Sequence, residues 1–175
     1  MEKERLPMPL SDQSLLAALL DSWDRNNTIL VNLLRAIHEG GLEARPIEST
    51  KSVAEMFTHL HYVRLVFISE DAPEFARTLP AKEWLAERDP QRIEEMLNES
   101  AEAVRDAVKG RLEAGKQMEL HYDHPILFLQ HMIWHEGYHH GQIKLALKAA
   151  GLALSDAQAG PVTWDIWMDK TLPSE

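Results

Sequence analysis

Residues 130–142 have the sequence QHMIWHEGYHHGQ, which places four of the chain's nine histidines within ten residues. The apolar residues in and around this segment recur with helical spacing. Each residue of a helix turns by about 100°, so the side chains of His135 and His139 lie about 40° apart on one face. Two imidazoles at this spacing can bind one metal ion. The segment therefore predicts a helix that contributes to a divalent-metal site.

Three further long amphipathic helices are expected before this one, with a short helix in the connection between the second and the third. Several residues mark the helix ends: Gly40 and Gly151 as stops, Ser52 with Glu55 as a capping box, and Asp89 as an N-cap. The long helices are expected over about 11–39, from 52 to about 70, from 90 onward and over 125–150, and the short one over 82–87.

No alternating strand pattern competes with these helices. Four amphipathic helices that are long enough to share a core predict an all-α fold, a four-helix bundle. A chain of 175 residues with 45% hydrophobic content suits one domain over residues 1–175. Residues 152–175 are too aromatic to be disordered, so we expect this C-terminal tail to pack on the bundle. Trp164 and Trp167 are expected to be core residues.

Composition narrows the possible functions. The chain has no cysteine, so any metal must be held by nitrogen or oxygen atoms. A net charge of -10 without a basic patch argues against nucleic-acid binding. No run of about 18 apolar residues could span a membrane, and the N-terminus lacks the apolar stretch of a signal peptide. We therefore expect a cytoplasmic protein without a membrane partner.

The predicted helix that contains residues 130–142 has two other interpretations. Its histidines can be ordinary solvated or core residues, although three imidazoles along one line are more than chance usually supplies. The segment from His135 to His139 also matches HExxH, the zinc motif of metalloproteases. Gly141 stands two residues after His139 instead of three, no further histidine follows, and no strand precedes the helix. Glu136 also points about 80° away from the mean direction of the two histidines, which suits the surface or the second shell better than a catalytic base.

The same segment resembles the C-terminal metal motif of the DinB/YfiT-like family of bacterial four-helix-bundle proteins. In that family an HxxxH pair precedes a residue that is usually basic and then Gly-Gln; here the pair is His135 and His139, followed by His140, Gly141 and Gln142. The family has a third histidine on its second helix after a short apolar stretch, and residues 54–60 resemble that stretch. The resemblance implies a DinB/YfiT-like bundle with metal ligands His59, His135 and His139.

Periodicity alone does not choose between His59 and His61, because both lie about 100° to either side of Leu60. The family resemblance selects His59.

Three further residues are candidates for the pocket or the second shell. His131 lies one turn before His135, so it is either a third ligand from the same helix or a residue that lines the pocket, and we expect it to line the pocket. Gln142 is favoured for the second shell by the resemblance. Asn27 interrupts the apolar stripe of the first helix, so it marks either a solvent-facing edge or a polar partner inside the bundle.

Three histidines leave an open coordination position, as catalytic sites require. Nitrogen ligands suit Zn²⁺ and Ni²⁺, and also Fe²⁺. The resemblance implies a metal-dependent thiol S-transferase with a small-molecule substrate, such as a low-molecular-weight thiol. The alternatives are a small metal-dependent hydrolase, and a non-catalytic metal-binding or ligand-binding module. We also expect a homodimer, formed through exposed apolar residues of the first and fourth helices.

Overall fold

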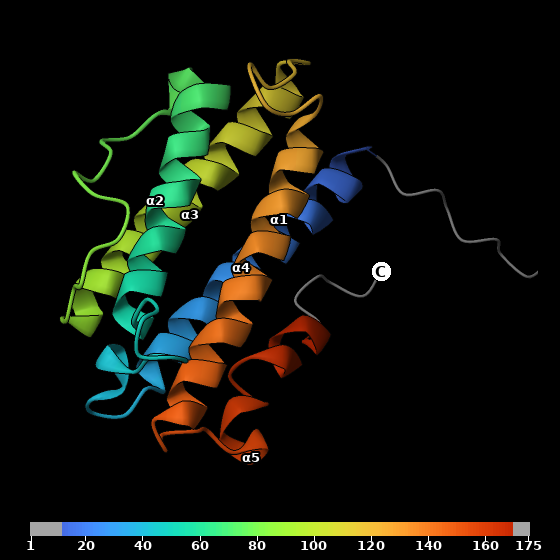
Figure 1. Ribbon diagram of the computed structural model, residues 1–175. Coiled ribbons are helices and arrows are strands. Elements are labelled where there is room, and N and C mark those ends of the chain that lie inside the picture. The colour runs from blue at the N-terminus through green and yellow to red at the C-terminus, as the bar shows by residue number, and fades with distance from the viewer. Residues whose placement is uncertain (1–11, 170–175) are drawn as a thin grey trace, which may run out of the picture.

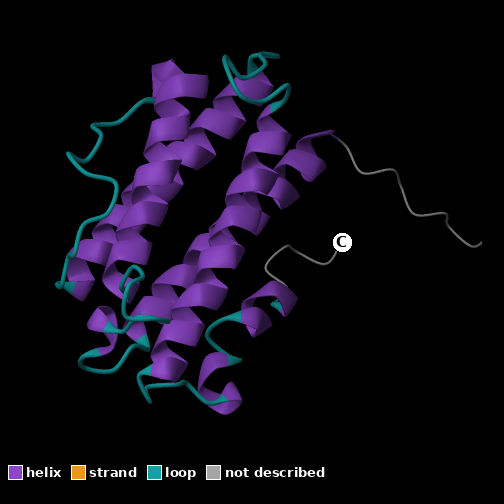
Figure 2. Cartoon of the chain, in the orientation of Figure 1, coloured by secondary structure: helices purple, strands orange, loops and turns teal. Residues whose placement is uncertain are grey.

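A computed structural model describes residues 12–169 of the chain. The described residues form helices and contain no strand, which confirms the all-α class and the four-helix bundle (Figures 1 and 2). The long helices are α1 (Asp12–Arg35), α2 (Val53–Asp71), α3 (Pro90–Glu113) and α4 (Pro125–Ala149). The short ones are α5 (Asp156–Ala159) and the 3-10 helices η1 (Gly41–Glu43), η2 (Pro73–Phe75) and η3 (Trp164–Met168).

The helix ends follow local hydrogen bonding. The expected capping box forms, since Glu55 N donates to Ser52 Oγ at 3.2 Å and Ser52 N donates to Glu55 Oε2 at 2.8 Å. Asp89 caps α3 by accepting from Gln91 N at 3.0 Å. Gly151 follows α4 with φ of 74°, the left-handed conformation typical of a helix stop.

Two expectations about helix bounds are wrong, and one falls outside the described residues. The first helix ends at Arg35 instead of about residue 39. Ala36 N–H is shared between the i-4 and i-3 carbonyls, Ile37 N–H bonds only the i-3 carbonyl, and Gly40 follows with φ of 81°. The expected start at Ser11 lies outside the described part of the chain. No helix forms over 82–87, because this segment is held by contacts with α2: Leu85 N donates to Thr58 Oγ1 at 3.0 Å, and Thr58 Oγ1 donates to Leu85 O at 2.8 Å.

The α2–α3 connection, residues 72–89, runs along the outside of the bundle (Figure 1). The α3–α4 connection is fixed by Asp71 at the end of α2. The buried Asp71 carboxylate accepts from the N–H groups of Leu120 at 2.9 Å and His121 at 2.7 Å, and it contacts His121 Nδ1 at 2.8 Å. Burial raises the pKa of Asp71, but the hydrogen bonds outweigh burial and hold the pKa below its ordinary value.

The C-terminal segment over residues 152–169 lies against α1 and α4. Asn32 Nδ2 donates to Val162 O at 3.0 Å, and Arg25 donates to Ile166 O. Lys144 Nζ lies 4.9 Å from the centre of the Trp164 ring. Trp164 and Trp167 stay partly exposed, so they are not core residues as expected.

None of the helices in the described residues has the length and apolar character that crossing a membrane requires.

Candidate metal centre

Three histidines from two helices converge in the bundle. His59 comes from α2, and His135 and His139 come from neighbouring turns of α4. One ring nitrogen of each lies within 4.8 Å of one ring nitrogen of each of the others. Among the described residues, this group contains no carboxylate. The cluster can therefore hold a metal ion with three imidazole ligands.

The distance between two of these nitrogens fits a single metal ion. Nε2 of His59 lies 3.3 Å from Nε2 of His135. Two nitrogens bound to one tetrahedral zinc ion at about 2.05 Å would stand about 3.3 Å apart. The ring centres of His135 and His139 are 4.6 Å apart, and those of His59 and His139 are 4.8 Å apart. Nδ1 of His139 is buried and has no hydrogen-bond partner among the described residues, which leaves it free to serve as a ligand.

The surroundings keep these imidazoles neutral, as metal ligands must be. Burial, followed by the imidazoles of His139 and His135, lowers the pKa of His59 to about 3. Burial, followed by His139 and His131, lowers the pKa of His135 to about 4. Burial also lowers the pKa of His139, and the nearby side chain of Gln142 opposes part of this shift.

Two residues of the α2–α3 connection lie against His59. The ring of Trp84 stacks on the imidazole, with centres 3.9 Å apart and planes 2° from parallel. Oε1 of Glu83 lies 2.9 Å from Nδ1 of His59, although the contact lacks the alignment of a hydrogen bond. Glu83 therefore meets the side of the ring opposite the Nε2 that faces His135. A carboxylate in this place favours the tautomer whose Nε2 is free to bind metal.

The structure places the second-helix alternative, His61, outside the cluster. His61 is buried, and its Nδ1 contacts the carbonyl oxygen of Met96 on α3 at 2.6 Å. His131 lies one turn from the cluster, with its ring centre 6.4 Å from that of His135, and its Nδ1 contacts the hydroxyl of Tyr122 at 2.7 Å.

Gln142 lies close enough to His139 to affect its pKa. Asn27 meets a polar partner inside the bundle: its Oδ1 accepts from Arg64 at 3.0 Å, while its Nδ2 donates to Asn98 at 2.9 Å.

Glu136 is part of a buried ion pair that its helical position alone did not predict. Its side chain is 1% exposed and that of Arg64 is 0% exposed. Nε of Arg64 donates to Oε1 at 2.6 Å, another guanidinium nitrogen donates to Oε2 at 2.9 Å, and Asn26 donates to Oε2 as well. Arg64 also donates to Leu97 O at 2.7 Å. Both carboxylate oxygens are thus occupied on the core side of α4, so Glu136 is not the solvent-facing base that a metalloprotease requires.

One feature of the sequence indicates the ion pair between Arg64 and Glu136. Arg64 stands at helical spacing between Leu60 and Ile68 on the buried face of α2, where a lone charge needs a partner. Glu136 stands four residues after the buried Met132. Opposite charges on two buried faces indicate a pair. Nothing in the periodicity points to Glu83 or Trp84, because their connection has no regular spacing.

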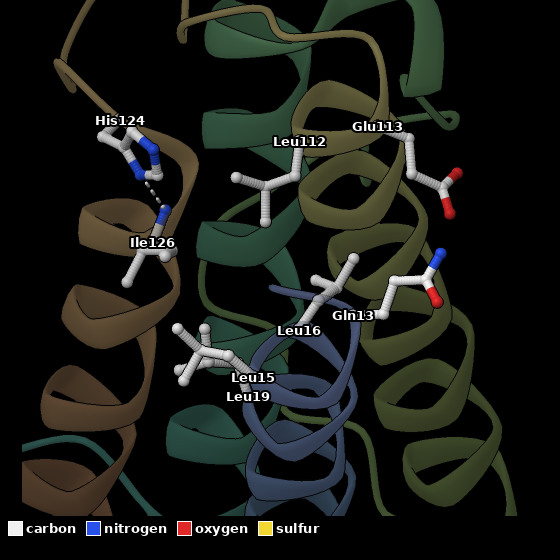
Figure 3. A pocket seen from close by; sticks show the side chains of 8 residues that line it. All are labelled: Gln13, Leu15, Leu16, Leu19, Leu112, Glu113, His124 and Ile126. Atoms are coloured by element: carbon white, nitrogen blue, oxygen red, sulfur yellow. Dashed lines mark hydrogen bonds between the residues drawn. The ribbon is translucent and has the colours of Figure 1, made fainter. Parts of the chain in front are cut away.

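A separate apolar groove lies at the other end of the bundle, where α1 begins, α3 ends and α4 begins (Figure 3). Its volume is about 430 Å³. Leucines of α1 face Ile126 of α4 across it, and His124 caps α4 at its edge by accepting from Ile126 N at 3.2 Å. None of the three clustered histidines lines this groove.

Comparison with known proteins places the chain in a family. A model of the DinB family matches residues 8–161. A solved structure assigned to that family, from Exiguobacterium sibiricum 255-15, is 20% identical with a TM-score of 0.57, over 84% of this chain and 97% of that one. At this identity the likeness shows the fold alone. No curated protein matches the chain. Because the family model spans most of its length, the chain belongs to the DinB family.

Proposed function

We propose that the protein is an enzyme that binds one divalent metal ion through His59, His135 and His139 and transfers the sulfur of a small thiol to an electrophilic substrate. A carbon–sulfur bond forms, the thiol gives up its proton, and the substrate releases its leaving group with the electron pair of the broken bond. The observation that carries the proposal is the convergence of three imidazoles without a fourth protein ligand in the group. The lowered pKa values of these histidines support it, because metal ligands must be neutral. Zn²⁺ or Ni²⁺ suits these ligands best, and Fe²⁺ also suits them. A three-histidine site with an open position is the arrangement of catalytic rather than structural metal sites.

His59, His135 and His139 would hold the divalent metal ion, which would lower the pKa of a thiol substrate and so supply a thiolate nucleophile at neutral pH. The protein residues orient the site. Trp84 holds the His59 ring in place by stacking, and Glu83 favours the tautomer with a free Nε2. His131 and Tyr122 border the cluster on the side of the preceding turn of α4.

Thiol transfer is preferred to hydrolysis because no free carboxylate faces the cluster to act as a base among the described residues. Glu136 is occupied by Arg64 and Asn26, and Glu83 lies behind His59 on the side of Nδ1. A hydrolase that activates water ordinarily combines its metal with such a base. A thiol substrate would need no such base, because a divalent metal ion held by the three histidines would itself favour the deprotonated thiol.

The test is a screen of metal-loaded protein with small thiols, such as cysteine and glutathione, and a chromogenic aryl halide. The proposal expects a product that contains the thiol sulfur, formed by the wild type and by His38→Ala but not by His139→Ala. His38 is the matched control because it lies outside the cluster. Product that forms equally well without thiol would instead identify a hydrolase. No turnover by fully loaded protein with four protein ligands would identify a metal-binding module.

A further inference from the structure

A second pocket lies on a different face of α4 from the three clustered histidines. Its walls come from α1, α4 and the C-terminal segment, and its volume is about 270 Å³. It is lined by Asn26 and apolar residues of α1, by Glu136 and His140 of α4, and by Trp164 and Trp167. Adjacent residues of a helix point about 100° apart, so His140 faces away from the cluster to which His139 belongs. We call this site the tryptophan pocket.

The two tryptophans of the pocket are held in place although their rings stay partly exposed. The exposed fractions of Trp164 and Trp167 are 41% and 44%. The segment that carries them is tied to α1, because Asn32 Nδ2 donates to Val162 O at 3.0 Å. The Trp164 ring also lies so close to Gly160 that a Cβ atom added there would stand 3.1 Å from it. Aromatic side chains fixed beside an opening offer a ligand a large apolar surface.

The imidazole of His140 brings an unpaired polar atom to the pocket. Nε2 of His140 is buried and has no hydrogen-bond partner among the described residues. Burial, followed by the charge of Lys144, lowers the pKa of His140, so the ring is neutral at pH 7. A buried polar atom without a partner costs free energy. A ligand with a hydrogen-bonding group would supply the missing partner.

The other polar groups of the pocket favour a neutral ligand that donates a hydrogen bond. Nδ2 of Asn26 donates to the Glu136 carboxylate, and a carboxylate only accepts, so the orientation of the amide is fixed. Oδ1 of Asn26 is then an acceptor, and no described residue donates to it. Of the described residues that line the pocket only Glu136 carries a formal charge, and Arg64 donates to both of its oxygens. No free charge is left to attract an ion.

The volume limits the size of the ligand. A cavity of about 150 Å³ holds a benzene ring, so about 270 Å³ has room for two fused rings. We propose that the tryptophan pocket binds a neutral molecule of one or two aromatic rings that packs against Trp164 and Trp167 and donates an N–H or O–H to Nε2 of His140. This proposal does not depend on metal binding or thiol transfer.

The first test measures the binding of indole by isothermal titration calorimetry. Indole has two fused rings and one N–H, and its dissociation constant should lie below about 1 mM. Indene has nearly the same shape without the N–H, so it should bind at least about 10-fold more weakly. No saturable binding of indole, or equal affinity for indene, would overturn the proposal.

The second test removes the unpaired nitrogen. His140→Leu should weaken indole binding about 10-fold. The melting temperature of this variant should stay at or above that of the wild type, because a buried nitrogen without a partner is lost. His38→Leu is the matched control, since His38 is exposed and lies outside the pocket, and it should leave the affinity unchanged. Equal indole affinity in His140→Leu and the wild type would overturn the proposal.

The third test locates indole in the unaltered chain by nuclear magnetic resonance. The side-chain N–H groups of the tryptophans in isotope-labelled protein report on separate places, because Trp164 and Trp167 line the pocket and Trp84 stacks on His59. Unlabelled indole should shift the Trp164 and Trp167 signals and leave that of Trp84 in place. Shifts confined to Trp84 would put indole at the metal centre, and unshifted pocket signals at saturating indole would equally overturn the proposal.

Discussion

Replacing Glu136 with alanine should destabilise the fold far more than replacing an exposed carboxylate. The change leaves the Arg64 guanidinium, which is 0% exposed, without its opposite charge. Removing one partner of a buried ion pair costs about 3–5 kcal/mol. Arg64 keeps its hydrogen bonds to Leu97 O and Asn27 Oδ1, and its guanidinium lies 4.8 Å from the Trp23 ring centre. We therefore expect a loss near the lower end, about 3 kcal/mol.

Urea unfolding followed by circular dichroism measures this loss of unfolding free energy. In a protein of this size, about 3 kcal/mol corresponds to a melting temperature lower by about 6–12 °C. The matched control is Glu95→Ala, which removes an exposed partner of Arg92 and should change stability by no more than about 0.5 kcal/mol. The double variant Arg64→Met/Glu136→Met should recover most of the loss, because it removes both buried charges. A loss below about 1 kcal/mol in Glu136→Ala, or a double variant no more stable than the single one, would refute the account of this pair.

Three further changes have defined outcomes. Trp84→Ala should weaken zinc binding about 10-fold in a calorimetric titration, because the ring that stacks on His59 is lost; unchanged affinity would show that the stack does not orient the ligand. The pKa of Asp71 is lower in the folded protein than in the unfolded chain, so the unfolded carboxyl binds its proton at a higher pH. Ionised Asp71 therefore stabilises the fold above about pH 4, and this stabilisation is lost as the pH falls further. Asp71→Asn should therefore show a flatter loss of stability than the wild type between about pH 4 and pH 2 in urea unfolding, and identical slopes would contradict this. Ser52→Ala should cost about 1 kcal/mol by removing the side-chain acceptor of the α2 capping box, and a loss below about 0.3 kcal/mol would argue that the box does not stabilise α2.

Sequence was sufficient for the parts of the fold that depend on local chemistry. The capping box at Ser52, the N-cap at Asp89 and the glycine stop at Gly151 each act through neighbouring residues, so their positions could be predicted. The segment over 82–87 could not be, because Trp84 and Leu85 are fixed by contacts with α2 that lie far away in the sequence.

The candidate site likewise has one part that local sequence patterns predict and another part that depends on how the helices pack. The spacing of His135 and His139 on one helix is local, and it indicated two of the clustered histidines. The choice of His59 over His61 depends on how α2 is rotated against α3 and α4, which periodicity left open because both histidines flank the middle of the buried face. In the structure His61 contacts the Met96 carbonyl, and His59 lies in the cluster.

X-ray absorption spectroscopy of zinc-loaded protein identifies the ligands of the metal ion. The proposed site predicts three imidazole nitrogens and one lighter, exchangeable ligand at about 2.0–2.1 Å in the wild type, and no bound zinc in His139→Ala. Addition of a small thiol should replace the exchangeable ligand with one sulfur at about 2.3 Å. Zinc bound with full stoichiometry by His139→Ala would contradict the ligand set, and a wild-type spectrum that thiol leaves unchanged would contradict the open position for a thiol.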